Sequence, residues 1–220
     1  DLYNKKLLHR SEEPTIWCTK HKTALAQAEV EDAKRITKLN YIKFGELTIA
    51  TTRPELLGSC VGIFINPKDK RYNKFVDKKI KVPLFNNDVK IMSDDKVDPN
   101  FGTGVVMTCN FGDTVDIEWW KKHKLDLRIS IKDDGTLNDN AGKYNGWKLK
   151  EAREEIIKDL DKNGFLIKQE DLEQNVGTCW RCGTPVEYII TKQWFIKTLD
   201  SKKDLIEQGR KVKWYPDFYR

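Results

Sequence analysis

The chain has 220 residues, of which 39% are hydrophobic and 34% charged. This composition excludes a disordered chain and predicts a soluble, globular protein with one substantial domain and a smaller module. No apolar run approaches the roughly 18 residues of a membrane span, and residues 1–10 lack the apolar stretch of a signal peptide. We expect a cytoplasmic protein with no membrane partner, cut from a larger one because its first residue is not Met.

Charge and cysteine content narrow the class of partner. The 40 Lys and Arg against 34 Asp and Glu give a net charge of +6. This charge favours a polyanion such as RNA, although solvated surface lysines explain it better when charge is taken alone. Five cysteines, an odd number, do not suit a secreted disulfide framework and favour a reducing compartment with a metal site.

The predicted elements begin with strands. Residues 1–25 are irregular in pattern, and from residue 45 onward runs of β-branched residues predict strands. These lie at residues 46–52, 61–65, 79–82, 89–92, 104–109 and 127–131. Asn, Pro, Asp and Gly separate the runs, and many short strands at this spacing favour a barrel or a strongly bent sheet.

Three helices are also predicted. Residues 116–124 follow a strand closely, and the apolar residues of 149–160 fall on one helical face, with Gly164 in the position of a C-terminal cap. The third helix is expected at residues 202–208, where Ser201 is a suitable N-cap and Gly209 follows.

Two cysteine pairs predict a metal site. Cys179 and Cys182 form a C-x-x-C-G knuckle, whose thiolates can bind one tetrahedral ion. Cys18 and His21 form the other C-x-x-[CH] pair. We therefore predict one Cys3His zinc ribbon made from both ends of the chain, which would close residues 22–178 into an insertion.

The other uses of cysteine are less well supported. A redox C-x-x-C begins a helix after a strand, and Gly183-Thr184-Pro185 does not resemble such a helix. Cys60 and Cys109 lie in strand contexts and are expected to be core thiols.

The first stretch with the composition of a site is TTRPE at residues 51–55. Hydroxyls and a guanidinium stand at the end of a predicted strand, which Pro54 terminates. Such groups can hold a ribose-phosphate end or orient a water. Locally, however, an ordinary strand end followed by a charged turn is the more common explanation.

The second stretch runs from DPNFGTG at residues 98–104 to Asp113 and Asp116. Small residues let a ligand approach the strand closely, and carboxylates three positions apart share one helical face. Such a pair can bind an ammonium group or polarise water. Asp113 as N-cap with Asp116 at the third helical position explains the same residues equally well.

Together these stretches resemble the connective-polypeptide editing domain of class I aminoacyl-tRNA synthetases, most closely the archaeal-like valyl branch. The resemblance covers nearly the whole chain. Its motifs are TALAQAEVE at 23–31, TTRPE, DPNFGTG, the Asp pair, and CWRCGTPVE at 179–187 running into TKQWF at 191–195. The isoleucyl branch usually has a third Thr and a Trp in the first stretch, so Arg53 and Glu55 favour the valyl branch. The leucyl branch also shows TTRP and is the alternative.

The resemblance implies an α+β, mainly β fold. Residues 26–174 would form a six-stranded, barrel-like editing core with peripheral helices. Residues 1–25 and 175–220 would form the two halves of the zinc ribbon, the second also returning to the synthetase core. The implied activity is hydrolysis of threonyl-tRNA(Val). An apolar pocket for valine cannot strongly reject threonine, which has the same shape and adds only a hydroxyl. A second site must therefore hydrolyse the threonine ester.

The resemblance also implies roles for single residues. Asp116 would bind the α-ammonium group, and Asp113 would help to read the threonine hydroxyl. Thr51, Thr52 and Arg53 would line the pocket and hold the terminal adenosine or the attacking water. Further substrate contacts are expected from Glu55, Gly102, Thr103, Gly104, Thr108 and Asn110.

One departure from the bacterial pattern affects hydroxyl recognition. That pattern has Lys and Thr where this chain has Met107 and Cys109. Thr108 or Asn110 would then take part of that role.

The implied partners are the 3′ end of mischarged tRNA and the remainder of the synthetase in cis, with the protein a monomer. The cofactor is structural zinc. No ATP site is expected, because the chain has no HIGH-like, KMSKS-like or Gly-rich nucleotide signature. Catalysis would use the tRNA's ribose hydroxyl and a positioned water, without a covalent protein nucleophile. The competing hypotheses are a zinc-ribbon module that only binds tRNA, and purely structural roles for both stretches.

Overall fold

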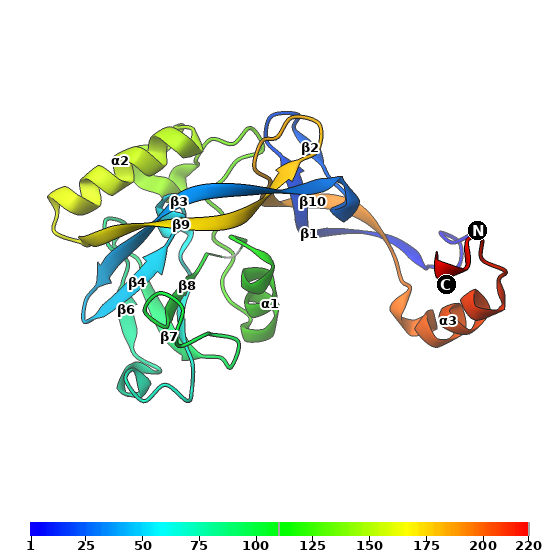
Figure 1. Ribbon diagram of the computed structural model, residues 1–220, viewed down its shortest axis with the longest axis horizontal. Helices are drawn as coiled ribbons and strands as arrows, with labels where there is room; N and C mark the ends of the chain where they lie inside the picture. Colours follow the sequence, from blue (N-terminus) through cyan, green and yellow to red (C-terminus); the bar gives the residue numbers. More distant parts are fainter. Residues whose placement is uncertain (110, 220) are drawn as a thin grey trace. The chain divides into compact units, whose positions relative to one another are not determined.

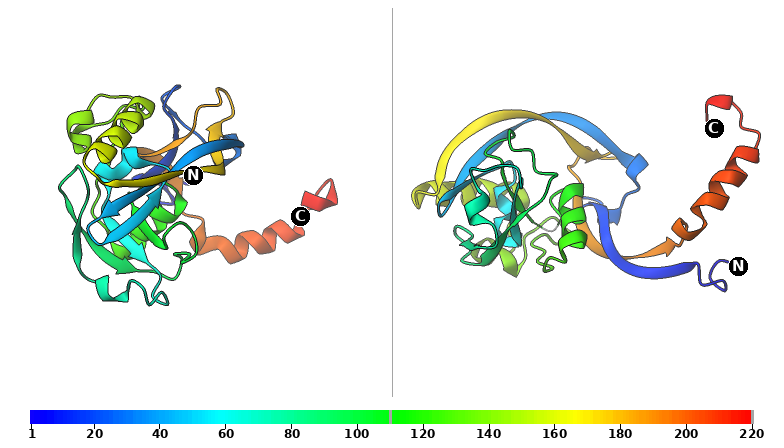
Figure 2. Two further views of the ribbon diagram at one scale, coloured as in Figure 1. Left: turned by 60° about the vertical axis from the view of Figure 1, so that its left-hand side comes forward. Right: turned by 90° about the horizontal axis from the view of Figure 1, so that it is seen from below.

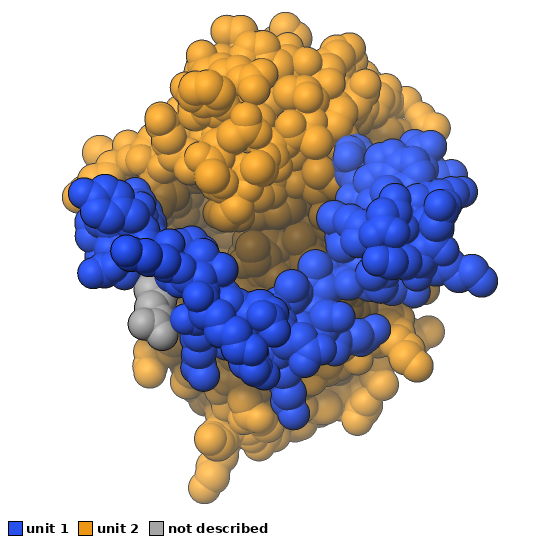
Figure 3. Space-filling view, turned by 90° about the vertical axis from the view of Figure 1, so that its right-hand side faces the viewer, with its two compact units in different colours: residues 1–13, 190–220 blue, residues 14–189 orange. Residues whose placement is uncertain are grey.

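The computed structural model describes residues 1–109 and 111–219. The chain separates into two compact units, one of Asp1–Glu13 with Ile190–Arg220 and one of Pro14–Ile189 (Figure 3). No helix within the described residues is long and apolar enough to cross a membrane.

The first unit contains the third predicted helix. α3 (Lys202–Lys211; Figure 1) follows η5 (Leu199–Ser201) and precedes η6 (Asp217–Tyr219). Ser201 occupies its N-cap position as predicted, but the serine side chain makes no capping hydrogen bond among the described residues. The helix continues through Gly209 to Lys211, three residues beyond the predicted end. None of its residues is buried. The unit also holds parts of β1 (Leu8–Cys18) and β10 (Glu187–Ile196). The start of the chain therefore contains a strand, although the sequence pattern predicted an irregular segment.

The second unit is dominated by a long two-stranded ribbon. β3 (Val30–Phe44) and β9 (Leu166–Cys179) pair antiparallel along almost their whole length, as Figures 1 and 2 show. β4 (Leu47–Thr51) adds to β3, which gives a sheet of order β4-β3-β9. The sequence did not predict the ribbon, because most of its outer positions are charged. Some of these residues form cross-strand ion pairs, such as Lys38–Asp171 at 2.6 Å.

A four-stranded sheet has the order β6-β7-β5-β8, with β5 and β7 parallel and the other neighbours antiparallel. Its strands are β5 (Gly62–Ile65), β6 (Lys79–Lys81), β7 (Asp88–Ser93) and β8 (Val105–Thr108). The third sheet has the order β10-β1-β2 and includes the short β2 (Thr23–Ala24). Short 3-10 helices connect the strands: η1 (Gln27–Glu29), η2 (Pro54–Ser59), η3 (Asn73–Phe75) and η4 (Asp139–Tyr144).

The mainly β class and five of the predicted strands are therefore confirmed, but two expectations are not. Residues 127–131 form no strand, only the single bridge Ile131↔Leu137. The described strands form separate sheets and no closed six-stranded barrel. Pro54 has no N–H to donate and begins η2, so the β4 ladder ends there and does not continue into β5.

Two helices pack on this unit. α2 (Leu149–Lys162) buries Ala152, Ile156 and Leu160 in the core, and Gly164 follows it at φ +69° as predicted. α1 (Thr114–His123) packs through Trp119, which stacks on Phe64 of β5 with ring centroids 4.4 Å apart. The core beneath them is made of alternating inward side chains of β3, β4, β5 and β7, among them Ile42, Phe44, Ile49, Ile63 and Ile91.

Candidate active site and metal cluster

A pocket of about 490 Å³ lies in the second unit, within the usual size of small-molecule sites. It brings together the two stretches that the sequence singled out. Thr51, Thr52 and Arg53 line it from the end of β4, and Asp113 and Asp116 line it from the start of α1. Its other lining residues are mostly apolar and include Leu56, Val97, Val105, Val106, Val115 and Trp119.

Hydrogen bonds on both sides fix the position of Thr51. Thr51 ends β4, where its carbonyl accepts a hydrogen bond of 3.0 Å from the Asn40 side chain. Its hydroxyl accepts one from the Arg53 N–H, also at 3.0 Å. The hydroxyl hydrogen of Thr51 is not used in this bond, because the oxygen is the acceptor.

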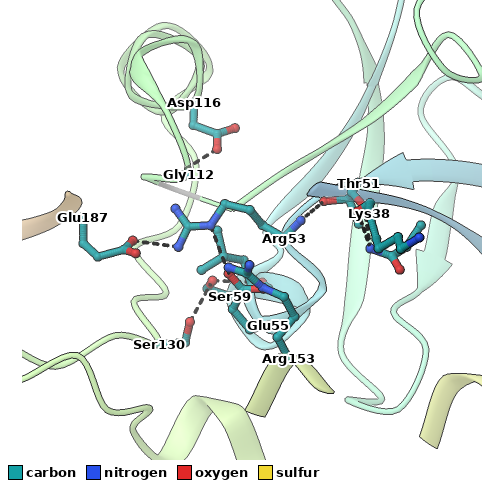
Figure 4. Close-up of polar contacts among 12 residues, drawn as sticks. Lys38, Thr51, Arg53, Glu55, Ser59, Gly112, Asp116, Ser130, Arg153 and Glu187 are labelled. Atoms are coloured by element: carbon teal, nitrogen blue, oxygen red, sulfur yellow. Dashed lines mark hydrogen bonds and ion pairs between the residues drawn. The ribbon is translucent and has the colours of Figure 1, made fainter. Parts of the chain in front are cut away.

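Arg53 is held by two buried carboxylates (Figure 4). Its Nε donates to Glu55 at 3.1 Å and its Nη2 to Glu187 at 2.7 Å. Glu55 also accepts two bonds from Arg153 of α2, at 2.7 and 2.8 Å. Glu55 is fully buried, does not line the pocket and contacts Arg53 and Arg153.

The two carboxylates of this network differ in their electrostatics. Burial raises the pKa of Glu187, and Arg53 offsets only part of that rise. Burial acts in the same direction on Glu55, but Arg53 and Arg153 together hold the pKa of that carboxyl below its usual value. Burial by itself would lower the pKa of Arg53, and Glu187 and Glu55 reverse this, so its guanidinium stays charged.

Asp113 caps α1 as predicted. Its carboxylate accepts the backbone N–H of Asp116 at 2.9 Å, which satisfies one free donor of the first helical turn. The capping and ligand-binding interpretations of Asp113 are compatible, because a carboxylate has further acceptor positions and Asp113 still lines the pocket.

Asp116 is almost fully buried at 7% exposure. Its carboxylate accepts the Gly112 N–H at 2.9 Å, an approach that requires glycine because a Cβ at position 112 would lie 2.5 Å from Oδ2. Burial, followed by the charge of Asp113, raises the pKa of Asp116 to about 7. A cation entering the pocket would favour its ionised form.

Thr108, a predicted substrate contact, does not line the pocket. Its hydroxyl is buried and has no hydrogen-bond partner of regular geometry among the described residues, yet it lies close enough to Asp116 to lower the pKa of that carboxyl. Met107 of β8 and Cys109, directly after that strand, do line the pocket. Asn110 lies outside the described residues.

The DPNFGTG loop contributes to the pocket through other residues than those expected. Gly102, Thr103 and Gly104 do not line it, whereas Asp98 and Phe101 do. The three shape the loop: the Thr103 hydroxyl donates to the Thr48 carbonyl at 2.6 Å, and both glycines have positive φ. A Cβ on Gly102 would lie 2.8 Å from Ala50, so glycine lets the loop pack on β4.

One wall of the pocket was missed by the sequence reading. Leu39 of β3 with Leu172 and Gln174 of β9 line the pocket from the ribbon. The pattern that marks these positions is weak, since each is an inward residue among charged neighbours on a two-residue period.

The predicted metal ligands come together in the second unit. Potential ligand atoms of Cys18, His21, Cys179 and Cys182 all lie within 4.8 Å of one another. Sγ of Cys18 is 3.7 Å from Sγ of Cys182 and 3.5 Å from Nδ1 of His21, and Sγ of Cys179 is 3.9 Å from the same nitrogen.

These distances fit a tetrahedral ion. Around zinc, with bonds of about 2.3 Å to sulfur and about 2.0 Å to nitrogen, ligand atoms lie about 3.8 Å (S–S) and about 3.6 Å (S–N) apart. A hydrogen bond to the Thr184 hydroxyl also lowers the pKa of the Cys182 thiol to about 7, which favours the thiolate. The cluster can therefore hold a metal ion.

Comparison with known proteins places the chain. The family described as tRNA synthetases class I (I, L, M and V) matches residues 1–220. The chain belongs to this family. It is 49% identical over 217 residues to the valine--tRNA ligase of Archaeoglobus fulgidus, covering 98% of the chain and 25% of the ligase. It is 50% identical over 224 residues to the valine--tRNA ligase of Thermoplasma volcanium, covering 100% and 28%.

The chain thus spans about a quarter of the length of these class I relatives. Among solved structures, a ternary complex of an Agrobacterium radiobacter K84 LeuRS with tRNA and LeuAMS matches 86% of the chain and 35% of that protein, with a TM-score of 0.48 and 16% identity.

Proposed function

We propose that the pocket hydrolyses the ester of threonyl-tRNA(Val), as the post-transfer editing site of a valine--tRNA ligase. The observation that carries the proposal is the joint lining of one pocket by Thr51, Thr52 and Arg53 with Asp113 and Asp116. The family and the identity of 46–50% to five of the archaeal valine--tRNA ligases favour valine over leucine or isoleucine as the cognate amino acid.

Recognition of the amino acid rests on the two carboxylates. A free α-ammonium group is the cation that would ionise Asp116, whose burial disfavours its charge in the empty pocket. Asp113, tied to the helix start, has acceptor positions left for the threonine hydroxyl. Valine lacks this hydroxyl and would leave a carboxylate oxygen unpaired, which is how a polar site rejects an isostere.

Hydrolysis needs a water molecule held in the correct orientation toward the ester. It does not need a covalent nucleophile from the protein. The Thr51 hydroxyl can donate to a water or to the terminal ribose, since its oxygen accepts from Arg53 N–H. Arg53 supplies a fixed positive charge beside the position where negative charge develops on the ester oxygen. The tRNA's own ribose hydroxyl completes the site.

The proposal includes the cofactor, the partners and the domain division. Zinc would be the ion at Cys18, His21, Cys179 and Cys182, with a structural role only. The partners would be the 3′ end of mischarged tRNA and the rest of the ligase in cis, in a cytoplasmic monomer. Residues 26–174 would be the editing domain, flanked by 1–25 and 175–220 as the zinc-ribbon halves. Aminoacylation and ATP binding would belong to the rest of the ligase.

Deacylation of mischarged tRNA tests the proposal. The ligase that carries this chain should release threonine from threonyl-tRNA(Val), and Asp116→Ala should reduce the rate by at least about tenfold through loss of the ammonium contact. Valyl-tRNA(Val) is the matched control and should stay intact.

The same assay separates the alternatives. Preferential hydrolysis of mischarged leucine or isoleucine tRNA would indicate the other branches of the family. Salt-sensitive tRNA binding without any hydrolysis would indicate a binding module. A folded Asp116→Ala variant with full activity would reject the role given to Asp116.

A further inference from the structure

The charged network behind the pocket assigns a role to two residues that lie outside TTRPE and the Asp pair, Glu187 and Arg153. We propose that Glu187 and Arg153 are positioning residues, which together with Glu55 hold the Arg53 guanidinium in one orientation at the pocket wall. The inference rests on the proposed function, because Arg53 belongs to the pocket that carries out the hydrolysis.

Glu187 reaches Arg53 directly. Its carboxylate accepts from Nη2 at 2.7 Å, and its side chain is only 7% exposed. The backbone before it is fixed at two points, because Val186 N donates to Gly177 O at 3.0 Å and Cys179 N to Thr184 O at 2.9 Å. The turn that carries Cys179 and Cys182 therefore sets where Glu187 stands.

Arg153 acts on Arg53 indirectly, through Glu55. It comes from α2 and donates both Nε and Nη2 to Glu55, at 2.8 and 2.7 Å. Glu55 in turn accepts from Arg53 Nε at 3.1 Å, so the same carboxylate joins the two guanidiniums (Figure 4). Arg153 thereby fixes the carboxylate that fixes Arg53.

The energetics favour a positioning role over a stabilising one. The Glu55 and Glu187 carboxylates are removed from water here, while the Arg53 and Arg153 side chains stay 23% and 37% exposed. A buried carboxylate in an ion pair repays its desolvation cost poorly compared with apolar packing. What the network does supply is orientation, because it holds a long side chain from two directions at once. A group misplaced by about 1 Å can lose about a hundredfold in rate.

Two variants of the full ligase test the proposal from opposite ends. Glu187→Gln keeps the shape but removes the charge, and Arg153→Lys keeps the charge but loses the two-pronged contact. For threonyl-tRNA(Val) we expect kcat to fall about ten- to a hundredfold, with KM changed by no more than about twofold. The rate of valine aminoacylation should stay the same.

A mutant cycle separates positioning from a loss of structure. In an Arg53→Gln background, Glu187→Gln should cause no further loss of kcat, because the residue it orients is gone. Tyr144→Phe is the matched control. It removes another buried hydrogen bond of the same unit, to Asp159 at 2.6 Å, and should lower the melting temperature without lowering kcat.

Two results would overturn the positioning role: folded variants with full kcat, or equal losses from Glu187→Gln with and without Arg53. Both presuppose an active wild type. A wild-type ligase that leaves threonyl-tRNA(Val) intact would instead reject the proposed function, and the positioning role with it.

Discussion

At the residue scale, burial decides what the charged groups of the pocket can do. Asp116 and Glu55 are both buried carboxylates, yet only Glu55 has guanidinium partners in the described structure. The pKa of Glu55 is therefore lowered, whereas that of Asp116 is raised to about 7. Glu55 is a permanent anion that holds Arg53. Asp116 is the group whose charge depends on pH and on a bound cation.

This difference predicts how stability and activity depend on pH. Because the folded pKa of Asp116 is about 7 against an ordinary 3.8, the folded state binds an extra proton between these values. The free energy of unfolding should then fall as pH rises from about 4 to about 7, by on the order of 4 kcal/mol. The deacylation rate should rise as the pH approaches and passes about 7, because the contact with the ammonium group needs Asp116 in its carboxylate form.

Urea unfolding and deacylation at pH 5 and pH 8 check this, with enzyme-free ester hydrolysis subtracted. Asp116→Asn is the control and should show a flatter stability profile. A wild type whose unfolding free energy does not change more steeply than that of Asp116→Asn would contradict the assignment.

At the element scale, the site depends on where elements end. β4 ends at Thr51 because Pro54 begins η2, and α1 begins at Asp113 because that carboxylate caps it. The two ends face one pocket although they are far apart in the chain. Leu172 and Gln174 of the ribbon line another wall of the pocket. The sequence did not predict this wall, because the outer positions of the same strands are charged.

The double role of Asp113 can be separated by two substitutions. Asp113→Ala loses the cap and should cost about 1 kcal/mol of unfolding free energy, together with editing activity. Asp113→Asn keeps a capping oxygen, so stability should be retained within a few tenths of a kcal/mol while deacylation falls. Chemical unfolding and deacylation assays of both variants distinguish the capping role of Asp113 from its role in editing. Full activity in Asp113→Asn would reduce Asp113 to a structural cap.

At the scale of the whole molecule, the metal cluster joins distant parts of the chain. Cys18 and His21 come from near one end of the sequence, Cys179 is the last residue of β9, and Cys182 follows it. Closing so long a loop reduces the conformational freedom of the unfolded chain, and ligand binding to the folded form alone adds stability by mass action.

Metal removal should therefore lower the stability of the folded chain measurably. We expect about one zinc ion per chain, and its chelation should lower the melting temperature. Cys182→Ser should lose the ion, whereas Cys60→Ala, at a buried thiol outside the cluster, should keep it. Elemental analysis and thermal melts of the two variants provide the test. A chain that binds no zinc when supplied with it would contradict the site.

The sequence by itself determined the local chemistry. The spacing of Cys and His predicted the four ligands, the position of Asp113 predicted a helix cap, and β-branched runs predicted six strands, of which five formed, because each depends on neighbouring residues. The tertiary structure alone decided which side chains face the pocket. Glu55 was expected beside the substrate and lies in the core, because Arg153 of α2 and Arg53 enclose it. Arg153 and Glu187 lie far from TTRPE in the chain, and no local pattern records a contact made only by folding.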